Sequence, residues 1–469
     1  MKKLSELYQG YPDILINDIK INSKEVEAND LFVCTKGVNA DRHDYVEDAI
    51  NHGAVAIIAS KKIDVSVPVV YVEDTNLELA KVCSKFYDYP QKKLSMVGIT
   101  GTNGKTGVAS LIRNLLGDDI CGYLGTNGIT CNCFDEKIRN TTPDSDRLFK
   151  YFDRFVKCGC KCLSMEASSE AFLRNRLNDI TFKVGIITNI SEDHLNVHKT
   201  MENYVSCKQD IINHIEPDGT LILNTDDEYY LETLKKAKGK VLTFGKNNAD
   251  LEIIKVNEYI DKTEATLRYK NNLYDITSPL LGEYNVYNLC AGILTLICYG
   301  YTIEEAIKRI PNIKTPKGRM EFLKFGQDYH IVIDYAHTTD AFIKIYSFLN
   351  KVKKGRLITI TGSAGGREHE KRKDMGKTVL DNSDYAIFTM DDPRWEDVNE
   401  IIDDLVSGTD KDNYTRIIDR EEAIKYAFGI AKKDDIILIA GKGDDNYMAY
   451  HDDYLPYKDE DIVIKYFEN

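Results

Sequence analysis

A glycine-rich stretch at residues 100–106 has the residue types of a phosphate-binding loop. It follows an apolar run suited to a buried strand and precedes a helical pattern, so its backbone amides would surround an anion at a helix N-terminus. Lys105 is expected to reach the outer phosphates, and Thr106 to place its hydroxyl on a magnesium ion. The usual loop opens with a glycine where this chain has Ile99, so the loop is a variant. We predict nucleotide binding, rather than an ordinary turn, by Gly101, Thr102, Asn103, Gly104, Lys105 and Thr106.

Two candidate metal ligands follow other predicted strands. Glu166 ends the apolar run at residues 161–167, and His194 comes shortly after the run at residues 184–190. The carboxyl ends of parallel strands share one edge of a sheet, where ligands bind, so both residues should lie near the loop. Either residue alone could be a polar group near a helix cap. Together with the phosphate loop, they predict a magnesium ion that bridges phosphates.

The composition excludes several classes of protein. The formal net charge of -14 and the pI near 5.3 argue against a nucleic-acid partner, because phosphate backbones are bound through basic surfaces. The first residues carry two lysines but no apolar stretch behind them, so no signal peptide is predicted. The longest apolar run, at residues 289–298, is too short to span a bilayer. We therefore expect a cytoplasmic protein with no membrane insertion.

The chain has 11 cysteines, which are expected to be reduced thiols in that compartment. Two groups of them fall at alternate positions and lack the two-residue gap of a zinc knuckle. Buried or strand-face thiols are therefore favoured over a zinc site for Cys131, Cys133, Cys158, Cys160 and Cys162.

Alternating apolar runs and helical stretches predict an α/β protein with mostly parallel sheets. The length of 469 residues suggests about three domains, and Pro90 marks a linker because proline ends the preceding helix. In the last part of the chain, polar groups at several strand ends indicate a substrate site. The expected domains are residues 1–91, 92–316 and 317–469.

The order of the motifs resembles that of a known family. The sequence is similar to the Mur ligases and, within them, to the UDP-N-acetylmuramoyl-tripeptide synthetases. The resemblance runs from residue 22 nearly to the C-terminus. The motifs that carry it are residues 100–106, 140–143, 165–169, 188–195, 201–208, 282–288, 318–321, 334–337, 391–394 and 440–443.

The resemblance implies three domains with separate roles. An N-terminal α/β domain would hold the UDP moiety, a central P-loop-type ATPase would carry a parallel sheet, and a C-terminal Rossmann-like α/β domain would bind the amino acid. The implied nucleotide contacts include Asn288, Arg319 and Asp334. The implied contacts to the muramoyl-peptide substrate are Ser23, Thr141, Thr142, Ser168 and Arg176.

The resemblance also implies ATP, Mg²⁺ and carbamylation of Lys208, which would turn an ammonium into a carboxylate-like metal ligand. From the residues alone, Lys208 is a solvated helix lysine. In the implied reaction, a carboxylate of UDP-muramoyl-dipeptide attacks the γ-phosphate of ATP, and the amine of a diamino acid then displaces phosphate from the acyl phosphate. This is a ligation of peptidoglycan synthesis, which serves cell-wall biogenesis, cell shape and division. Lys105 and the metal would neutralise the repulsion between the two anions. A monomer acting on small molecules is expected.

The choice of diamino acid depends on two departures from the family pattern. Diaminopimelate-adding members typically read Asp-Asn-Pro-Arg, and this chain has Asp392 in place of the asparagine while it keeps Arg394. That arginine suits the distal carboxylate of diaminopimelate, whereas Asp392 would equally suit the bare ammonium of L-lysine. Arg394 could instead form an ion pair with Asp391 or Glu396. The second departure is Asp445, which stands in place of the family's glutamate and could meet the distal ammonium. The remaining implied contacts to the amino acid are Arg367 and Gly441.

Glu170 and Asp444 also depart from the family pattern, since each stands where histidine is usual. They leave open a divergent paralogue that acts on a related nucleotide-peptide. A nucleotide-binding switch or ATPase that has lost ligation is a second alternative, although Lys208 and Arg394 argue against it. A folylpolyglutamate-like ligase is a third, which the motifs at residues 140–143 and 392–394 disfavour.

Overall fold

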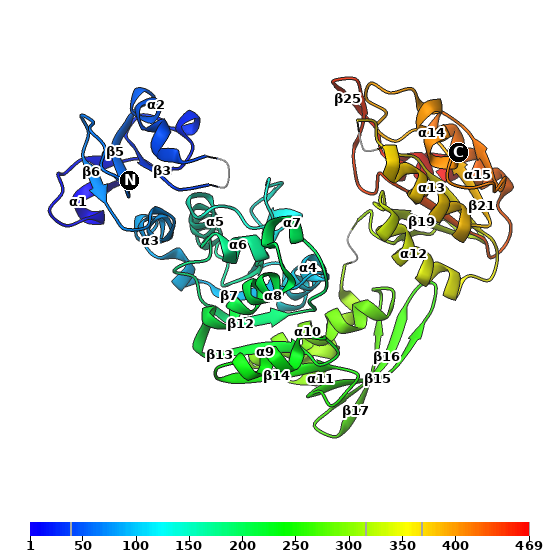
Figure 1. The fold of residues 1–469 in the computed structure, drawn as a ribbon. Helices are drawn as coiled ribbons and strands as arrows, with labels where there is room; N and C mark the ends of the chain where they lie inside the picture. The colour runs from blue at the N-terminus through cyan, green and yellow to red at the C-terminus, as the bar shows by residue number, and fades with distance from the viewer. Residues whose placement is uncertain (38–39, 315–316, 367–368, 469) are drawn as a thin grey trace. The chain divides into compact units, whose positions relative to one another are not determined.

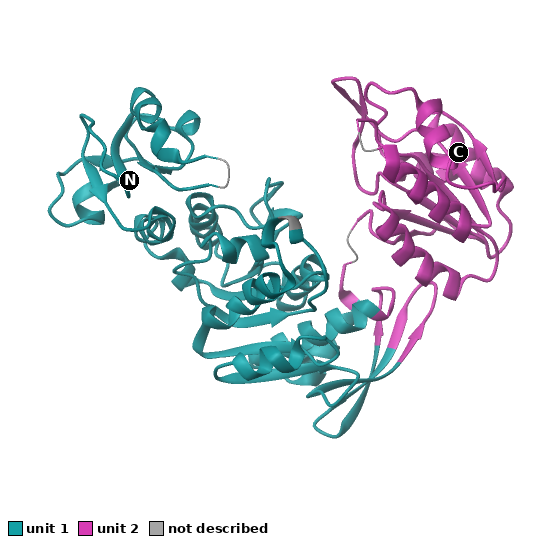
Figure 2. Ribbon diagram, in the orientation of Figure 1, with its two compact units in different colours: residues 1–255, 265–276, 284–311 teal, residues 256–264, 277–283, 312–469 magenta. Residues whose placement is uncertain are grey.

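The computed structural model describes residues 1–37, 40–314, 317–366 and 369–468 (Figure 1). The chain forms two compact units, which are coloured separately in Figure 2. Unit 1 comprises residues 1–255, 265–276 and 284–311, and unit 2 comprises residues 256–264, 277–283 and 312–469. Two positions named above, residue 316 at a predicted domain boundary and Arg367, lie outside the described residues.

The N-terminal part of unit 1 has a small parallel sheet in the order β3-β4-β5-β6. Helix α3 follows it because Asp74 caps the first turn by accepting hydrogen bonds from two backbone amides, and because one side of the helix is apolar. The elements are β1 (Lys2–Lys3), α1 (Leu4–Leu7), β2 (Leu15–Ile16), β3 (Ile19–Lys20), η1 (Ser23–Glu25), β4 (Asp30–Val33), η2 (Arg42–Tyr45), α2 (Val46–Asn51), β5 (Ala54–Ala59), β6 (Val69–Tyr71), α3 (Thr75–Phe86) and η3 (Pro90–Lys93).

The large sheet has the strand order β10-β9-β8-β11-β7-β12-β13-β14-β15-β16-β17. Strands β8, β11, β7, β12, β13 and β14 are parallel to one another, and β9 and β10 extend one edge as an antiparallel hairpin. The strands are β7 (Ser95–Thr100), β8 (Cys121–Gly125), β9 (Gly128–Thr130), β10 (Asp135–Glu136), β11 (Cys162–Glu166), β12 (Phe182–Ile187), β13 (Ile215–Asn224), β14 (Lys240–Gly245), β15 (Leu251–Glu258), β16 (Thr263–Tyr269) and β17 (Asn272–Ser278).

Three of the helices that accompany this sheet begin at side-chain caps, which are Ser168 for α6, Thr200 for α8 and Thr302 for α11. Helix α4 packs on β7, β8 and β11 through residues such as Val108, Leu111 and Ile112. The helices are α4 (Lys105–Leu116), α5 (Ser145–Lys157), α6 (Ser169–Leu173), α7 (Leu195–His198), α8 (Met201–Gln209), η4 (Asp210–His214), α9 (Tyr230–Lys236), α10 (Glu283–Cys298), α11 (Ile303–Ile307) and η5 (Ile310–Asn312).

Unit 2 is built on a six-stranded sheet in the order β18-β19-β23-β20-β21-β22, in which only the β18–β19 pair is antiparallel. Alternate side chains of its strands enter two cores, one with α12, α13 and α14 and the other with α15 and α16. The elements are β18 (Glu321–Leu323), β19 (His330–Asp334), α12 (Thr339–Val352), β20 (Leu357–Thr361), α13 (His369–Asn382), β21 (Tyr385–Phe388), α14 (Val398–Val406), β22 (Tyr414–Arg416), α15 (Arg420–Ile430), β23 (Ile436–Ala440), β24 (Tyr447–Tyr450), β25 (Asp453–Pro456) and α16 (Asp459–Glu468).

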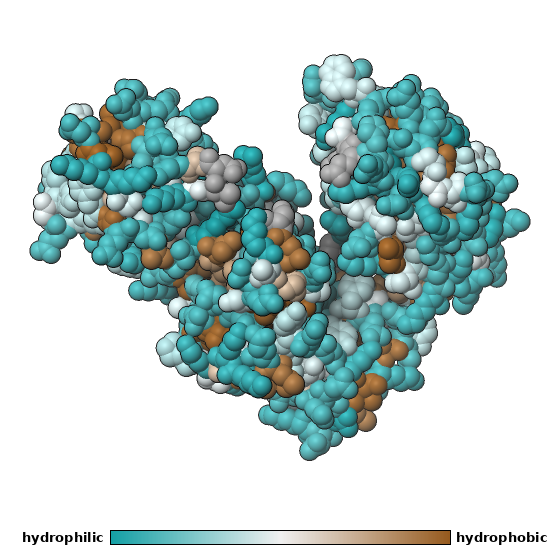
Figure 3. Space-filling view, viewed as in Figure 1, coloured by the Kyte–Doolittle hydropathy of each residue, from teal (hydrophilic) through white to brown (hydrophobic). Residues whose placement is uncertain are grey.

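These sheets confirm the predicted α/β class with mostly parallel strands. Among the described helices, none is long and apolar enough to cross a membrane. Hydrophilic residues predominate on the face of the molecule shown in Figure 3, and apolar side chains are scattered over it in small groups.

Candidate active site

The glycine-rich loop joins β7 to α4, in the strand-loop-helix context that the sequence predicted. Gly101 and Gly104 have φ values of 146° and 86°, which favour glycine. A Cβ on Gly101 would lie 1.9 Å from Oγ1 of Thr188, so the close packing also requires glycine there. The Thr188 hydroxyl donates to the carbonyl of Asn103 at 2.6 Å, and the side chain of Asn189 accepts from the Asn103 amide at 3.0 Å. The end of β12 therefore fixes the loop.

Two lysines from different helices meet at this loop. The Nζ of Lys105 donates to the carbonyls of Gly101 and Thr102, both at 2.9 Å, and the Nζ of Lys208 donates to the same Gly101 carbonyl at 2.7 Å. Lys208 is only 1% exposed, and burial together with the charge of Lys105 lowers its pKa to about 7. Burial also lowers the pKa of Lys105. Neither lysine forms an ion pair with any described residue, although the charges of Glu166 and Asp193 act on Lys105 from a longer distance.

Glu166 ends β11 and is fully buried. Its Oε1 accepts hydrogen bonds from the Tyr123 hydroxyl at 2.7 Å and from the Thr126 amide at 2.9 Å, and its Oε2 accepts one from the Thr126 hydroxyl at 3.2 Å. A Cβ on Gly125 would lie 2.2 Å from Oε1, so the end of β8 can approach the carboxylate only with glycine there. Sequence reasoning missed Tyr123, Gly125 and Thr126. In the sequence, the only feature that could have indicated them is the Gly-Thr pair at residues 125–126, at the end of the apolar run that forms β8.

The predicted substrate residues are tied to the same strand end. The Thr142 hydroxyl donates to the Glu166 carbonyl at 2.8 Å and accepts from the Ser168 amide at 3.1 Å. Arg176 donates to the Thr142 carbonyl at 3.0 Å and to Asp144 at 2.6 Å. This network holds the 140–144 segment beside Glu166.

A cavity of about 530 Å³ in unit 1 brings most of these side chains together. His194 lines it as an exposed residue at the start of α7, with its Nε2 3.4 Å from Asp193. The predicted residues that line it are Thr102, Asn103, Gly104, Lys105, Thr106, Thr141, Thr142, Glu166, Ser168, Arg176, His194 and Lys208. Sequence reasoning had not proposed Gly107, Thr126, Arg139, Asn140 or Ser169 as site residues.

Three other residues of unit 1, either predicted as contacts or divergent from the family, differ in where they lie relative to the cavity. Asn288 lies beside the loop, since its Oδ1 would be 3.1 Å from a Cβ on Gly104. Ser23 is buried in η1 and is not among the residues that line the cavity. Glu170 does line the cavity, and it also pairs with Arg174 at 3.0 Å.

Unit 2 has a separate cavity of about 650 Å³ at the carboxyl ends of its strands. Of the predicted residues, Asp392, Gly441 and Asp445 line it. Arg394 does not line it, but its Nη1 would be 3.9 Å from a Cβ on Gly366, which does. Arg394 is exposed, and its side chain forms no ion pair with any described residue, so the predicted alternative pairing is not observed.

The carboxylate of Asp392 is held by protein donors. Its Oδ1 accepts from the Nζ of Lys442 and from the amide of Ala449, both at 2.8 Å. Lys442 is fully buried and lies 3.6 Å from Asp445 as well. The Asp392 carboxylate, which the sequence suggested as a partner for a substrate ammonium, is therefore already paired with the buried Lys442.

Two further predicted residues belong to unit 2. Asp334 is buried and accepts the amides of Met320 and Ala336, each at 2.7 Å, and burial raises its pKa. Arg319 stacks over the ring of Tyr335 at 4.7 Å.

The comparisons with known proteins agree with the motif order. Three family models match successive parts of the chain: "Mur ligase family, catalytic domain" at residues 15–96, "Mur ligase middle domain" at residues 99–296 and "Mur ligase, glutamate ligase domain" at residues 318–443. They confirm the predicted three-domain α/β architecture.

Similar proteins cover nearly the whole chain. The UDP-N-acetylmuramoyl-L-alanyl-D-glutamate--2,6-diaminopimelate ligase of Fusobacterium nucleatum is 37% identical over 95% of this chain and 92% of its own. A second such ligase, from Clostridium acetobutylicum, is 35% identical over 98% of this chain and 96% of its own. A solved structure of a ligase of that name has a TM-score of 0.76 at 27% identity and covers 99% of this chain and 98% of its own. The chain therefore belongs to the Mur ligase family, as its motifs predicted.

Proposed function

We propose that this protein is the ATP-dependent ligase that joins 2,6-diaminopimelate to UDP-N-acetylmuramoyl-L-alanyl-D-glutamate in peptidoglycan synthesis. The observation that carries the proposal is the unit 1 cavity, where the glycine-rich loop, two desolvated lysines and a buried glutamate converge in a chain whose full-length relatives have that name. The sequence left L-lysine open as the amino acid, and the names of the relatives favour diaminopimelate.

The reaction fits the charges of this cavity. The free carboxylate of the dipeptide attacks the γ-phosphorus of ATP, which gives an acyl phosphate and releases ADP. The amine of diaminopimelate then attacks the acyl carbon, so that an amide and phosphate form and the amine loses a proton. The first step brings two anions together, and Lys105 with the loop amides would stabilise the charge that develops on the phosphoryl oxygens. Thr141, Ser168 and Arg176 would hold the peptide carboxylate beside them.

A magnesium ion fits the donors that line this cavity. Mg²⁺ prefers oxygen ligands, and the Thr106 hydroxyl and the Glu166 carboxylate are both present. When bound, the ion supplies charge neutralisation to the phosphates. His194 would add a nitrogen ligand. We propose that Lys208 joins this set as a carbamate, because a buried amine with a pKa of about 7 has a substantial neutral fraction near physiological pH and can then react with CO₂.

The domain roles remain part of the proposal. Residues 1–91 would hold the UDP moiety through Ser23, residues 92–316 would bind ATP, and residues 317–469 would bind the amino acid. Asn288, Arg319 and Asp334 would contact the nucleotide. Arg367, Asp392, Arg394, Gly441 and Asp445 would contact the amino acid. The predicted monomer is tested by its mass in solution.

The decisive experiment is an ADP-release assay with product identification by mass spectrometry. ADP release should require both UDP-N-acetylmuramoyl-L-alanyl-D-glutamate and meso-diaminopimelate, and L-lysine and L-ornithine serve as competing amino acids. No turnover with any of the three amino acids would refute the ligase. ATP hydrolysis independent of amino acid would favour the alternative of an ATPase that has lost ligation.

A further inference from the structure

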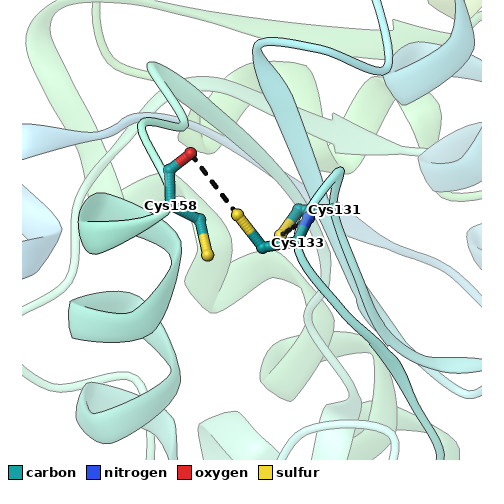
Figure 4. A group of neighbouring side chains, drawn as sticks. All are labelled: Cys131, Cys133 and Cys158. Carbon is teal, nitrogen blue, oxygen red and sulfur yellow. Dashed lines mark hydrogen bonds between the residues drawn. The ribbon is translucent and has the colours of Figure 1, made fainter.

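A group of cysteines lies away from the unit 1 cavity, at the tip of the β9–β10 hairpin and the end of α5. The Sγ atoms of Cys131, Cys133 and Cys158 all lie within 4.8 Å of one another (Figure 4). Cys131 is buried, Cys158 is half-buried and Cys133 is exposed. Cys160, also buried, adjoins Cys131. The sequence spacing had favoured buried or strand-face thiols over a zinc site, whereas the fold brings two Cys-x-Cys segments together.

Contacts other than those between the sulfurs hold the two segments in place. The ring of Phe134 packs on the ring of Phe155 with centroids 5.1 Å apart, and the guanidinium of Arg154 lies 4.3 Å from the Phe134 centroid. Arg154 also forms an ion pair with Glu136 at 2.5 Å. Within the hairpin, the Cys131 amide donates to the Phe134 carbonyl at 2.8 Å. The cluster is therefore preorganised by α5 and does not depend on a bond between the cysteines.

The spacing of the sulfurs, all within 4.8 Å of one another, is compatible with ligation of a metal ion. A tetrahedral zinc ion with Zn–S bonds of about 2.3 Å holds its sulfur ligands roughly 3.8 Å apart. A disulfide would instead need two sulfurs about 2.05 Å apart, and all 11 cysteines are free thiols. Cys158 caps the C-terminus of α5, where the helix dipole favours a cation.

We propose that Cys131, Cys133 and Cys158 form a binding site for a thiophilic divalent cation of the Zn²⁺ class, with water as the fourth ligand on the exposed side. Each thiol that binds as a thiolate releases its proton to solvent, so affinity falls as the pH falls. The site fastens the hairpin to α5. Residues 139–142, which line the unit 1 cavity, follow directly after this hairpin.

The test measures zinc in the full-length protein, purified without a metal-affinity tag or chelator and under a thiol-compatible reductant. We expect one zinc per chain by elemental analysis, and a sulfur-to-metal charge-transfer band when Cd²⁺ is titrated into the zinc-free protein. Cys133→Ser and Cys158→Ser should each weaken Zn²⁺ binding by at least about tenfold. Cys298→Ser, which alters a half-buried cysteine outside the cluster, should keep both signals.

A thermal melt provides an independent measurement, because a cation that binds only the folded state raises the Tm. Zn²⁺ should raise the Tm of the unaltered protein and of Cys298→Ser, and should have little effect on Cys133→Ser. Cys133 is exposed, so its serine variant is expected to fold. Equal zinc content in Cys133→Ser and the unaltered protein, or absence of the Cd²⁺ band, would each overturn the proposal.

Discussion

The cavities of the two units differ in the partners of their basic side chains. In unit 1, Lys105 and Lys208 bond to backbone carbonyls of the loop, and neither is paired with a carboxylate among the described residues. In unit 2, the buried Lys442 is paired with Asp392, and Arg372 is paired with Glu396 and Asp404 at 2.7 and 2.9 Å. Backbone carbonyls therefore hold the lysines of the first cavity, whereas carboxylates of the protein pair with the buried lysine and arginine of the second.

This difference shows how each cavity can select its ligand. A desolvated cation without a partner is costly, so an entering phosphate recovers free energy through charge alone. A cavity whose ion pairs are already formed gains little from one more charge and must discriminate by the positions of its donors and acceptors. Basic groups without ion-pair partners suit a nucleoside triphosphate, and a cavity with preformed ion pairs suits a zwitterion such as a diamino acid. Breaking one charge in each cavity tests the distinction.

The largest effect is expected from Lys105→Ala. This change removes the charge that faces the transferred phosphoryl group, and loss of one such donor typically costs about 10²–10³-fold in kcat. ADP release in the complete assay measures it. Lys235→Ala, on the exposed face of α9, is the control and should leave kcat unaltered. An unaltered kcat for Lys105→Ala would mean that its observed bonds to Gly101 and Thr102 are purely structural.

In unit 2, Asp392→Asn should act mainly on stability. The amide keeps the shape of the side chain but leaves the buried ammonium of Lys442 with a weaker partner, so the free energy of unfolding should fall by about 1.5–3 kcal/mol. Denaturant unfolding measures it. The control is Asp444→Asn, which breaks an ion pair between Lys458 and a half-exposed carboxylate and should cost at most about 1 kcal/mol. Equal losses in the two variants would contradict a structural role for the Asp392–Lys442 pair.

The sequence could predict local motifs but not contacts between residues far apart in the chain. The loop and the strand ends were predictable because glycine, lysine and threonine at fixed spacing define a local structure, which residues 100–106 adopt between β7 and α4. The environment of Glu166 was not, because the sheet order places β11 between β7 and β8 and so brings Thr126 to a glutamate 40 residues away. The Asp392–Lys442 pair joins two strand-end loops 50 residues apart. No local pattern encodes such a contact.

The burial of Lys208 was likewise invisible in the sequence, where it looked like a surface lysine. Its pKa of about 7 results from desolvation and from Lys105, opposed by Asp193 and Cys207. Only the neutral amine reacts with CO₂, so at fixed CO₂ pressure the carbamate should increase with pH. From one pH unit below that pKa to one above it, the neutral fraction rises about tenfold.

Carbon-13 NMR of the protein under labelled CO₂ measures this carbamate. Lys208→Arg keeps the positive charge but removes the reactive amine, so the signal should disappear. A signal that persists in Lys208→Arg would arise from another amine. A signal that is absent from the unaltered protein throughout this pH range would mean that Lys208 acts as an amine.

The smallest expected effect is that of Arg394→Ala. Its guanidinium is exposed at the edge of the unit 2 cavity, near Gly366, and has no ion-pair partner among the described residues. Like Lys105 in unit 1, it has no carboxylate partner among the described residues, but solvent screens its charge. Exposed charge pairs contribute up to about 1 kcal/mol, so the KM for meso-diaminopimelate should rise about two- to fivefold.

Comparing the KM for meso-diaminopimelate with the KM for L-lysine shows whether Arg394 recognises the distal carboxylate. L-lysine lacks the distal carboxylate, so its KM should be unaffected by Arg394→Ala, and Arg416→Ala, which removes a partly exposed arginine paired with Asp403, should affect neither amino acid. Equal rises in the KM for both amino acids would mean that Arg394 maintains the loop and does not recognise the ligand. A rise for diaminopimelate alone would show that the second cavity adds charge recognition at its exposed edge, because its buried lysine and arginine are already paired with carboxylates.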